Sequence, residues 1–278
     1  MIAAYPELLP ETTGLPSPVG VELQSGTKPQ LRFERDVRTD VADDRWTTDL
    51  ADVAREPDTL RRARAEPVYT VYRRVLPGGG VSREIERHGL TYNLLVMRGG
   101  TLPGATEYVR NRGHANSVAP GTSLPYPEIH ELLTGEAWLY LQHGTTDTPT
   151  DTVVIPLRAG QKAIIAPGFA SLIVNVGDKP LVVGTWRMND CETRHDELEA
   201  LGGMAHFVLK GGDGKPFCEA NERYKTVPVP RTALPHVLPD FGLSEGEPLL
   251  SAFHRSPESL RCLLRPQDFA DTWKTLYD

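Results

Sequence analysis

The sequence contains little cysteine. Its 278 residues include three, Cys191, Cys218 and Cys262, which are odd in number and far apart along the chain. Such a set excludes a disulfide scaffold and a zinc ribbon, because both need several closely spaced cysteines. The cysteine content therefore predicts a protein of the reducing cytoplasm.

Long apolar runs and an excess of positive charge are also missing. No stretch approaches the roughly 18 apolar residues of a membrane span, and the N-terminal segment lacks the basic and apolar regions of a secretory signal. The formal net charge is -7, which disfavours nucleic-acid binding. We therefore expect a small-molecule partner, with neither nucleic acid nor a membrane.

Glycine and proline are abundant, with 25 and 24 residues, and this is too many for a helical bundle. From Pro67 onward the apolar residues follow the period of two that is typical of strands. Nine strand-like runs separated by turn residues predict an all-β antiparallel sandwich or barrel. The runs are 68–76, 90–100, 106–114, 128–135, 137–144, 151–160, 161–168, 170–177 and 180–188.

Two flanking regions have other patterns. Residues 1–30 are rich in proline but carry apolar side chains such as Tyr5 and Leu8, so we expect an arm that packs on another surface. Residues 44–66 have helical spacing, and Pro57 is expected to divide them into two short helices.

The C-terminal tail is expected to be partly helical. In its last segment Pro266 suits a first helical turn, and Phe269, Trp273 and Leu276 fall on one face. We expect this tail to cover part of the barrel and to shape access to its pocket or a dimer contact. The predicted division is thus an N-terminal arm and helix (1–66), a barrel (67–210) and a C-terminal extension (211–278).

Several motifs carry a family resemblance. In "GQKAIIAPGFASLIVN", Gly160, Pro167 and Asn175 have the spacing of the second cupin motif, and in "GHAN…PEIHELLTG" Glu128 precedes Gly135 by seven residues, as in the first. With "EPVYTVYRRV" and "HDEL", these stretches resemble the cupin-type glucose-6-phosphate isomerases from about residue 21 to residue 224. The resemblance implies a cupin jelly-roll barrel and a homodimer.

The resemblance also implies a divalent metal held by an HxH pair, a glutamate and a later histidine. The first histidine matches His114 and the glutamate matches Glu128, whereas Asn116 and Ser171 stand where the other two histidines belong. His130 lies two residues after Glu128 and should share its strand face.

Two interpretations of these residues stay open. His114, Glu128 and His130 would form a two-histidine, one-carboxylate set suited to Fe, Mn, Zn or Ni. In the other interpretation no metal binds, and His130 simply forms a hydrogen bond with Glu128 inside the lumen.

A sugar-phosphate site is implied as well. The tyrosine and the glycine of the family's phosphate grip match Tyr69 and Gly113, and one of its threonines falls at Asn111. Arg112 flanks that position and could bind a phosphate bidentately. An exposed arginine pair, Arg110 with Arg112, on the rim of the barrel is the alternative. His195 matches a family histidine just beyond the last barrel strand, and its alternative is a surface residue or a helix cap.

Three functions follow. The resemblance implies an aldose–ketose isomerase that works through an enediol, with Glu128 as base and His114 or His130 polarising the oxygen. The second hypothesis is an enzyme of specialised metabolism acting on a non-phosphorylated substrate with little or no metal. The third is a non-catalytic cupin that binds a small molecule. The isomerase class is carried forward as the leading interpretation.

Overall fold

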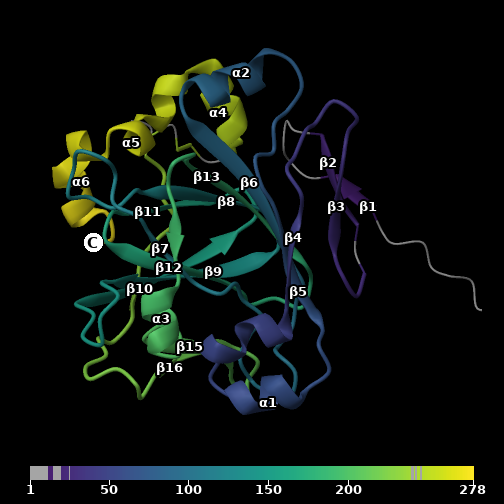
Figure 1. Ribbon diagram of the computed structural model, residues 1–278, viewed down its shortest axis with the longest axis vertical. Coiled ribbons are helices and arrows are strands. Elements are labelled where there is room, and N and C mark those ends of the chain that lie inside the picture. The colour runs from purple at the N-terminus through teal and green to yellow at the C-terminus, as the bar shows by residue number, and fades with distance from the viewer. Residues whose placement is uncertain (1–11, 15–19, 25, 239–240, 242, 245) are drawn as a thin grey trace, which may run out of the picture.

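Two β-sheets lie face to face and form the centre of the protein (Figure 1). The computed structural model describes residues 12–14, 20–24, 26–238, 241, 243–244 and 246–278. The larger sheet has the strand order β11-β8-β13-β6-β5-β4, and the smaller one has the order β12-β9-β10-β17. Neighbouring strands are antiparallel, except that β17 runs parallel to β10. This architecture confirms the predicted all-β core.

The larger sheet contains β4 (Asp43–Trp46), β5 (Pro67–Tyr72), β6 (Leu90–Met97), β8 (Glu128–Thr134), β11 (Lys162–Ile165) and β13 (Leu181–Met188). The smaller sheet contains β9 (Glu136–His143), β10 (Asp151–Arg158), β12 (Phe169–Asn175) and β17 (Arg231–Thr232). A three-stranded sheet contains β1 (Thr12–Gly14), β2 (Val21–Gln24) and β3 (Gln30–Phe33). Two further pairs are β7 (Ala115–Asn116) with β14 (Thr193–Arg194), and β15 (His206–Lys210) with β16 (Pro216–Ala220).

Strand alternation creates the core between the two sheets. Leu132 of the larger sheet and Leu139, Leu141 and Ile173 of the smaller one belong to the same buried cluster. Gly135 forms the tight turn between β8 and β9 with a φ of 92°, and a Cβ there would lie 2.7 Å from the Leu181 side chain. A glycine is therefore needed where these two strands pass from one sheet to the other.

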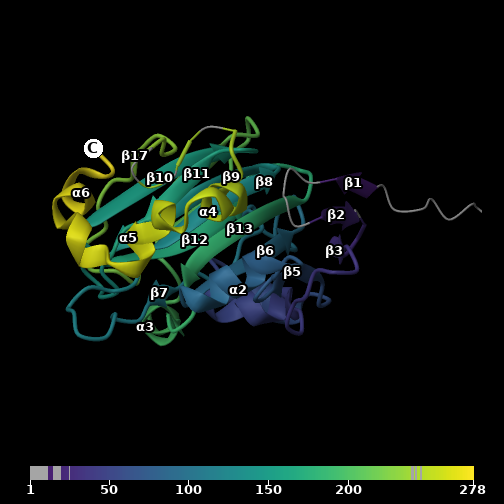
Figure 2. The same ribbon diagram turned by 90° about the horizontal axis from the view of Figure 1, so that it is seen from above.

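Helices cover the outer face of the larger sheet (Figure 2). They are α2 (Gly80–Arg87), α4 (Leu249–Arg255), η3 (Pro257–Leu260) and α5 (Arg261–Leu264). Trp186 of β13 and Phe253 of α4 lie with their ring centroids 5.3 Å apart in this layer. Glu131 of β8 accepts the backbone N–H of Leu249 at 3.1 Å, which fixes the start of α4 on the sheet.

The tail ends in η4 (Pro266–Phe269) and α6 (Ala270–Thr275), and it packs on the protein as predicted. Phe269, Trp273 and Leu276 are partly buried against the core. The Tyr277 hydroxyl donates to the Ile164 carbonyl at 2.9 Å and accepts the Ala166 N–H at 2.8 Å.

The segment predicted as helical from residue 44 begins as a strand. Residues 43–46 form β4 on the edge of the larger sheet, and only then follow η1 (Thr47–Val53) and α1 (Pro57–Arg62). The expected helix start was therefore wrong, because the alternating side chains of Asp43 and Arg45 suit a sheet edge. The break at Pro57 is confirmed, since α1 begins there. Tyr5 and Leu8 of the arm lie outside the described residues, and the three-part division of the chain stays a prediction.

Eight of the nine predicted strands are confirmed, and residues 106–114 are the exception. They form isolated bridges, among them Arg110 with Val174 and His114 with Ser171. Gly113 has a φ of 79°, which interrupts the extended backbone just before His114. This interruption decides where the neighbouring side chains point.

Candidate functional site

A cavity of about 130 Å³ lies against the inner face of the larger sheet, between β4–β6, β8, β13 and the segment 111–114. Every candidate catalytic or substrate-binding residue proposed from the sequence lines it. Its lining is Asp43, Arg45, Tyr69, Val71, Arg73, Asn93, Leu95, Asn111, Arg112, Gly113, His114, Glu128, His130, Ile173, Val183, Thr185, Arg187, Thr193 and His195.

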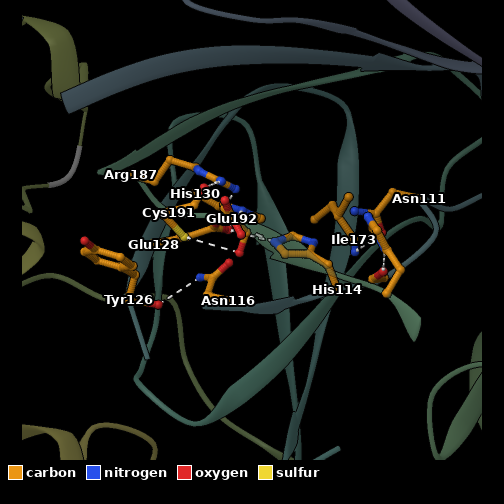
Figure 3. A network of polar contacts seen from close by, with 12 residues as sticks. Asn111, His114, Asn116, Tyr126, Glu128, His130, Ile173, Arg187, Cys191 and Glu192 are labelled. Carbon is orange, nitrogen blue, oxygen red and sulfur yellow. Dashed lines mark hydrogen bonds and ion pairs between the residues drawn. The ribbon is translucent and has the colours of Figure 1, made fainter. Parts of the chain in front are cut away.

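Glu128 is the centre of a polar network inside this cavity (Figure 3). The Nε2 atom of His114 lies 3.3 Å from its Oε2, and the Nε2 atom of His130 lies 3.4 Å from the same oxygen. Arg187 donates from Nη1 to Oε1 at 2.9 Å. Three basic side chains therefore surround one carboxylate, which is 1% exposed.

These neighbours decide the charge of Glu128. Burial raises the pKa of a carboxyl, but the contacts with His114, His130 and Arg187 outweigh burial and hold the pKa of Glu128 well below its usual range. Glu128 is consequently an anion at physiological pH. An anion held this firmly is a weak base, because basicity falls with pKa.

The two substituted ligand positions lie beside the network. The Asn116 amide donates from Nδ2 to the Tyr126 carbonyl at 2.8 Å, as Figure 3 shows. Ser171 forms two backbone hydrogen bonds with His114, at 2.8 and 3.0 Å. Both residues are buried, but neither belongs to the cavity lining.

His195 lies at the start of α3 (Asp196–Ala200), and its ring centroid is 6.2 Å from that of His114. Its Nδ1–H donates to the Gly113 carbonyl at 2.7 Å, which leaves Nε2 as the acceptor of the neutral ring. Burial lowers the pKa of His195, and the Gly113 contact only partly opposes this effect. The ring is therefore neutral near pH 7 and half-buried beside the cavity.

The two arginines at residues 110 and 112 separate, so the predicted exposed pair is wrong. Arg110 is 3% exposed and forms an ion pair with buried Glu107, at 2.6 Å, away from the cavity. Arg112 lines the cavity and pairs with Glu199 of α3. Residues 106–114 form isolated bridges and no continuous strand, so the alternation that would have placed Arg110 and Arg112 on one face does not apply.

Arg187 was missed by the sequence analysis, although a signal for it exists. In "PLVVGTWRM" the large Trp186 packs outward, so the alternating residues Val183, Thr185 and Arg187 must face the cavity. Arg45 was missed because its strand was interpreted as a helix.

The tail contributes no residue to the cavity within the part of it that the structure describes. The described residues of 231–278 pack instead on the outer face of the larger sheet and, through Ala233 and Tyr277, on the core, and a role of the tail in pocket access or a dimer contact stays a prediction.

The residues present do not form the metal site that the resemblance implies. Among the described residues, no group of three or more His, Cys, Asp and Glu side chains is arranged to hold a metal ion. Asn116 is turned to a carbonyl, and the guanidinium of Arg187 already lies on the carboxylate that would be the anionic ligand.

A family model described as "Glucose-6-phosphate isomerase (GPI)" matches residues 44–225. The chain belongs to this family. Its fold is the cupin fold, as the motifs predicted. No curated protein sequence matches the chain. Within the described residues, no helix has the length and apolar character needed to cross a membrane.

Solved structures also show similarity. Vicilin from Corylus avellana (hazelnut) is 11% identical with a TM-score of 0.33, and the match covers 45% of this chain and 32% of that one. A recombinant oxalate oxidase in complex with glycolate is 18% identical with a TM-score of 0.27, and the match covers 35% of this chain and 41% of that one. Oxalate decarboxylase from Bacillus subtilis at pH 4.6 is 16% identical with a TM-score of 0.30, and the match covers 44% of this chain and 26% of that one. The matches thus span less than half of each of these chains.

Proposed function

We propose that this member of the glucose-6-phosphate isomerase family is an enzyme that moves a proton between adjacent carbons of a small anionic substrate, such as a sugar phosphate. The supporting observation is one cavity that unites three imidazoles, a buried carboxylate anion and several arginines. Aldose–ketose isomerisation needs this combination, because a base must take a proton while cationic donors stabilise the enediolate oxygen.

The charge of the cavity supports an anionic substrate over a neutral one. Four arginines line it, against two carboxylates, and the histidines add no negative charge. A cleft with an excess of positive charge attracts anions and raises their local concentration. The arginines are Arg45, Arg73, Arg112 and Arg187, and the carboxylates are Asp43 and Glu128.

Binding of a phosphate or carboxylate group is assigned to the side of the cavity near Tyr69. Arg45 and Arg112 lie close enough to Tyr69 to lower the pKa of its hydroxyl, although burial has the larger, opposite effect and raises it overall. The phenol therefore stays protonated and can donate. Asn111 lies on the same side, where its Oδ1 accepts the Ile173 N–H at 3.0 Å and its amide nitrogen is left to donate.

Proton abstraction is assigned to His195. Its Nε2 carries a lone pair, because Nδ1–H is held by Gly113, and its lowered pKa keeps the ring neutral. Glu128 was expected in this role from the cupin resemblance, but its lowered pKa favours His195.

Glu128 is then a positioning residue. It holds the Nε2 atoms of His114 and His130 and one nitrogen of Arg187. Arg187 has five N–H donors, and among the described residues two contacts, to Glu128 and to the Cys191 carbonyl, use them. The remaining donors are available to the oxygen on which negative charge develops.

The test follows the interconversion of glucose 6-phosphate and fructose 6-phosphate by NMR. Wild type is compared with His195→Gln and with the matched control His254→Gln, which changes an exposed histidine outside this cavity. We expect His195→Gln to lower kcat by about 10²- to 10⁴-fold and to remove the acidic limb of the pH profile, while the control changes neither.

Two results would redirect the proposal. Full turnover in His195→Gln would move the base elsewhere. Absence of turnover in wild type, combined with turnover of a non-phosphorylated ketose or aldose, would favour the enzyme of specialised metabolism.

A further inference from the structure

The cation that faces Glu128 is part of the chain itself. Arg187 comes from β13 and reaches across the inner face of the sheet to Glu128 on β8. His130 follows Glu128 by two residues on the same strand. The Arg187 side chain is 11% exposed and that of Glu128 is 1% exposed, so both charges are largely withdrawn from water. A contact of this kind is retained only where the two charges compensate each other.

We propose that the guanidinium of Arg187 takes the place of a divalent metal ion in this cavity and excludes one. A metal would need to lie about 2.0–2.2 Å from His114, Glu128 and His130 at once. The Arg187 nitrogen, 2.9 Å from Oε1 of Glu128, would then stand a few ångströms from a dication.

Two features of the site strengthen the exclusion. A guanidinium does not lose its proton in proteins, so Arg187 cannot become neutral to admit a metal. Its second nitrogen is held by the Cys191 carbonyl, which ties the side chain to the loop after β13 and prevents it from swinging away freely.

The loss of the two family ligands fits the same exchange. With Arg187 in place, the pocket needs no third or fourth imidazole, and the Asn116 side chain instead donates to the Tyr126 carbonyl. His114 and His130 keep their contacts with Glu128 because the carboxylate remains an anion whichever cation balances it.

The experiment measures metal binding directly, with Co²⁺ as the probe, by its visible absorption and by equilibrium dialysis. Wild type is compared with Arg187→Met, which removes the charge and keeps most of the side-chain length, and with Arg187→Lys, which keeps the charge. The double variant Glu128→Gln/Arg187→Met reports whether any new binding uses this site.

We expect wild type and Arg187→Lys to bind Co²⁺ weakly. Arg187→Met should bind at least about 10-fold more tightly, since a like charge at close range is removed, and the double variant should lose this gain. Equal affinity of wild type and Arg187→Met, with Arg187→Met folded by circular dichroism, would overturn the inference. If Arg187→Met fails to fold, the comparison is made between wild type and Glu128→Gln. One equivalent of Co²⁺ bound tightly by wild type and lost in Glu128→Gln would overturn the inference, whereas wild type without tightly bound Co²⁺ would support it.

Discussion

Replacing Glu128 by glutamine tests the electrostatic account of the cavity through stability. The change keeps the shape of the side chain but removes the anion that faces Arg187, His114 and His130. Arg187 is then left as a cation with little access to water. Removing one partner of a buried ion pair typically costs 3–5 kcal/mol, and we expect about 3 kcal/mol here because the new amide oxygen still accepts a hydrogen bond.

The double variant Glu128→Gln/Arg187→Met should recover most of this loss. It removes both charges together, and replacing a buried pair by uncharged residues of similar volume is often nearly neutral. We expect the double variant to lie within about 1 kcal/mol of wild type, so the effects of the two single changes should be clearly non-additive.

Urea unfolding provides the measurement, with an unchanged m-value as the sign that the folded and unfolded states stay comparable. The matched control is Asp271→Asn, which breaks an exposed pair with Lys274 at 2.8 Å, and it should leave the urea midpoint of unfolding unchanged. Additive effects of Glu128→Gln and Arg187→Met would refute the reasoning, since they would show that the two charges do not interact.

Three further predictions concern the rest of the molecule. Burial lowers the pKa of His206 and of His236 to about 4, below the unfolded value of 6.5, so the unfolded state binds protons first on acidification. The free energy of unfolding should therefore fall between pH 6.5 and pH 4 by up to about 3 kcal/mol for each histidine. A thermal-denaturation midpoint that stays constant over this pH range would contradict the prediction. Tyr277→Phe removes two hydrogen bonds to residues 164 and 166 and should cost about 1–2 kcal/mol in urea unfolding without changing turnover; an unchanged midpoint of unfolding would show that the tail is not anchored there. Light scattering at micromolar concentration should give the mass of a homodimer, and a monomer would contradict the prediction drawn from the cupin resemblance.

The sheet-forming part of the chain was predictable because alternation and turn residues agree there. Leu132 and Leu139 alternate with residues that pack on the outer faces, and Gly135 marks the turn between them. Residues 106–114 were not predictable in the same way, because the buried Arg110–Glu107 pair and the positive φ of Gly113 are tertiary features that the strand period does not reveal.

The site was predictable as a set of residues but not as an electrostatic unit. His114, Glu128 and His130 could be placed in one lumen from motif spacing and strand parity. The partner of Glu128 lies 59 positions later in the sequence, so the Arg187 contact depends on how β8 and β13 pair in the sheet. The low pKa of Glu128, and hence the transfer of the proposed base to His195, follow from the contacts with His114, His130 and Arg187 together, which only the folded chain brings to one carboxylate.

Exchange of substrate hydrogen with solvent tests the central claim most directly. The protein is incubated with fructose 6-phosphate in D₂O with a metal chelator present, and deuterium incorporation next to the carbonyl is followed by NMR. The account predicts incorporation in wild type and its loss in His195→Gln, with the substrate still bound. Tight binding of the sugar phosphate by wild type without any deuterium incorporation, with or without added metal, would contradict it and identify the cavity as a binding site only.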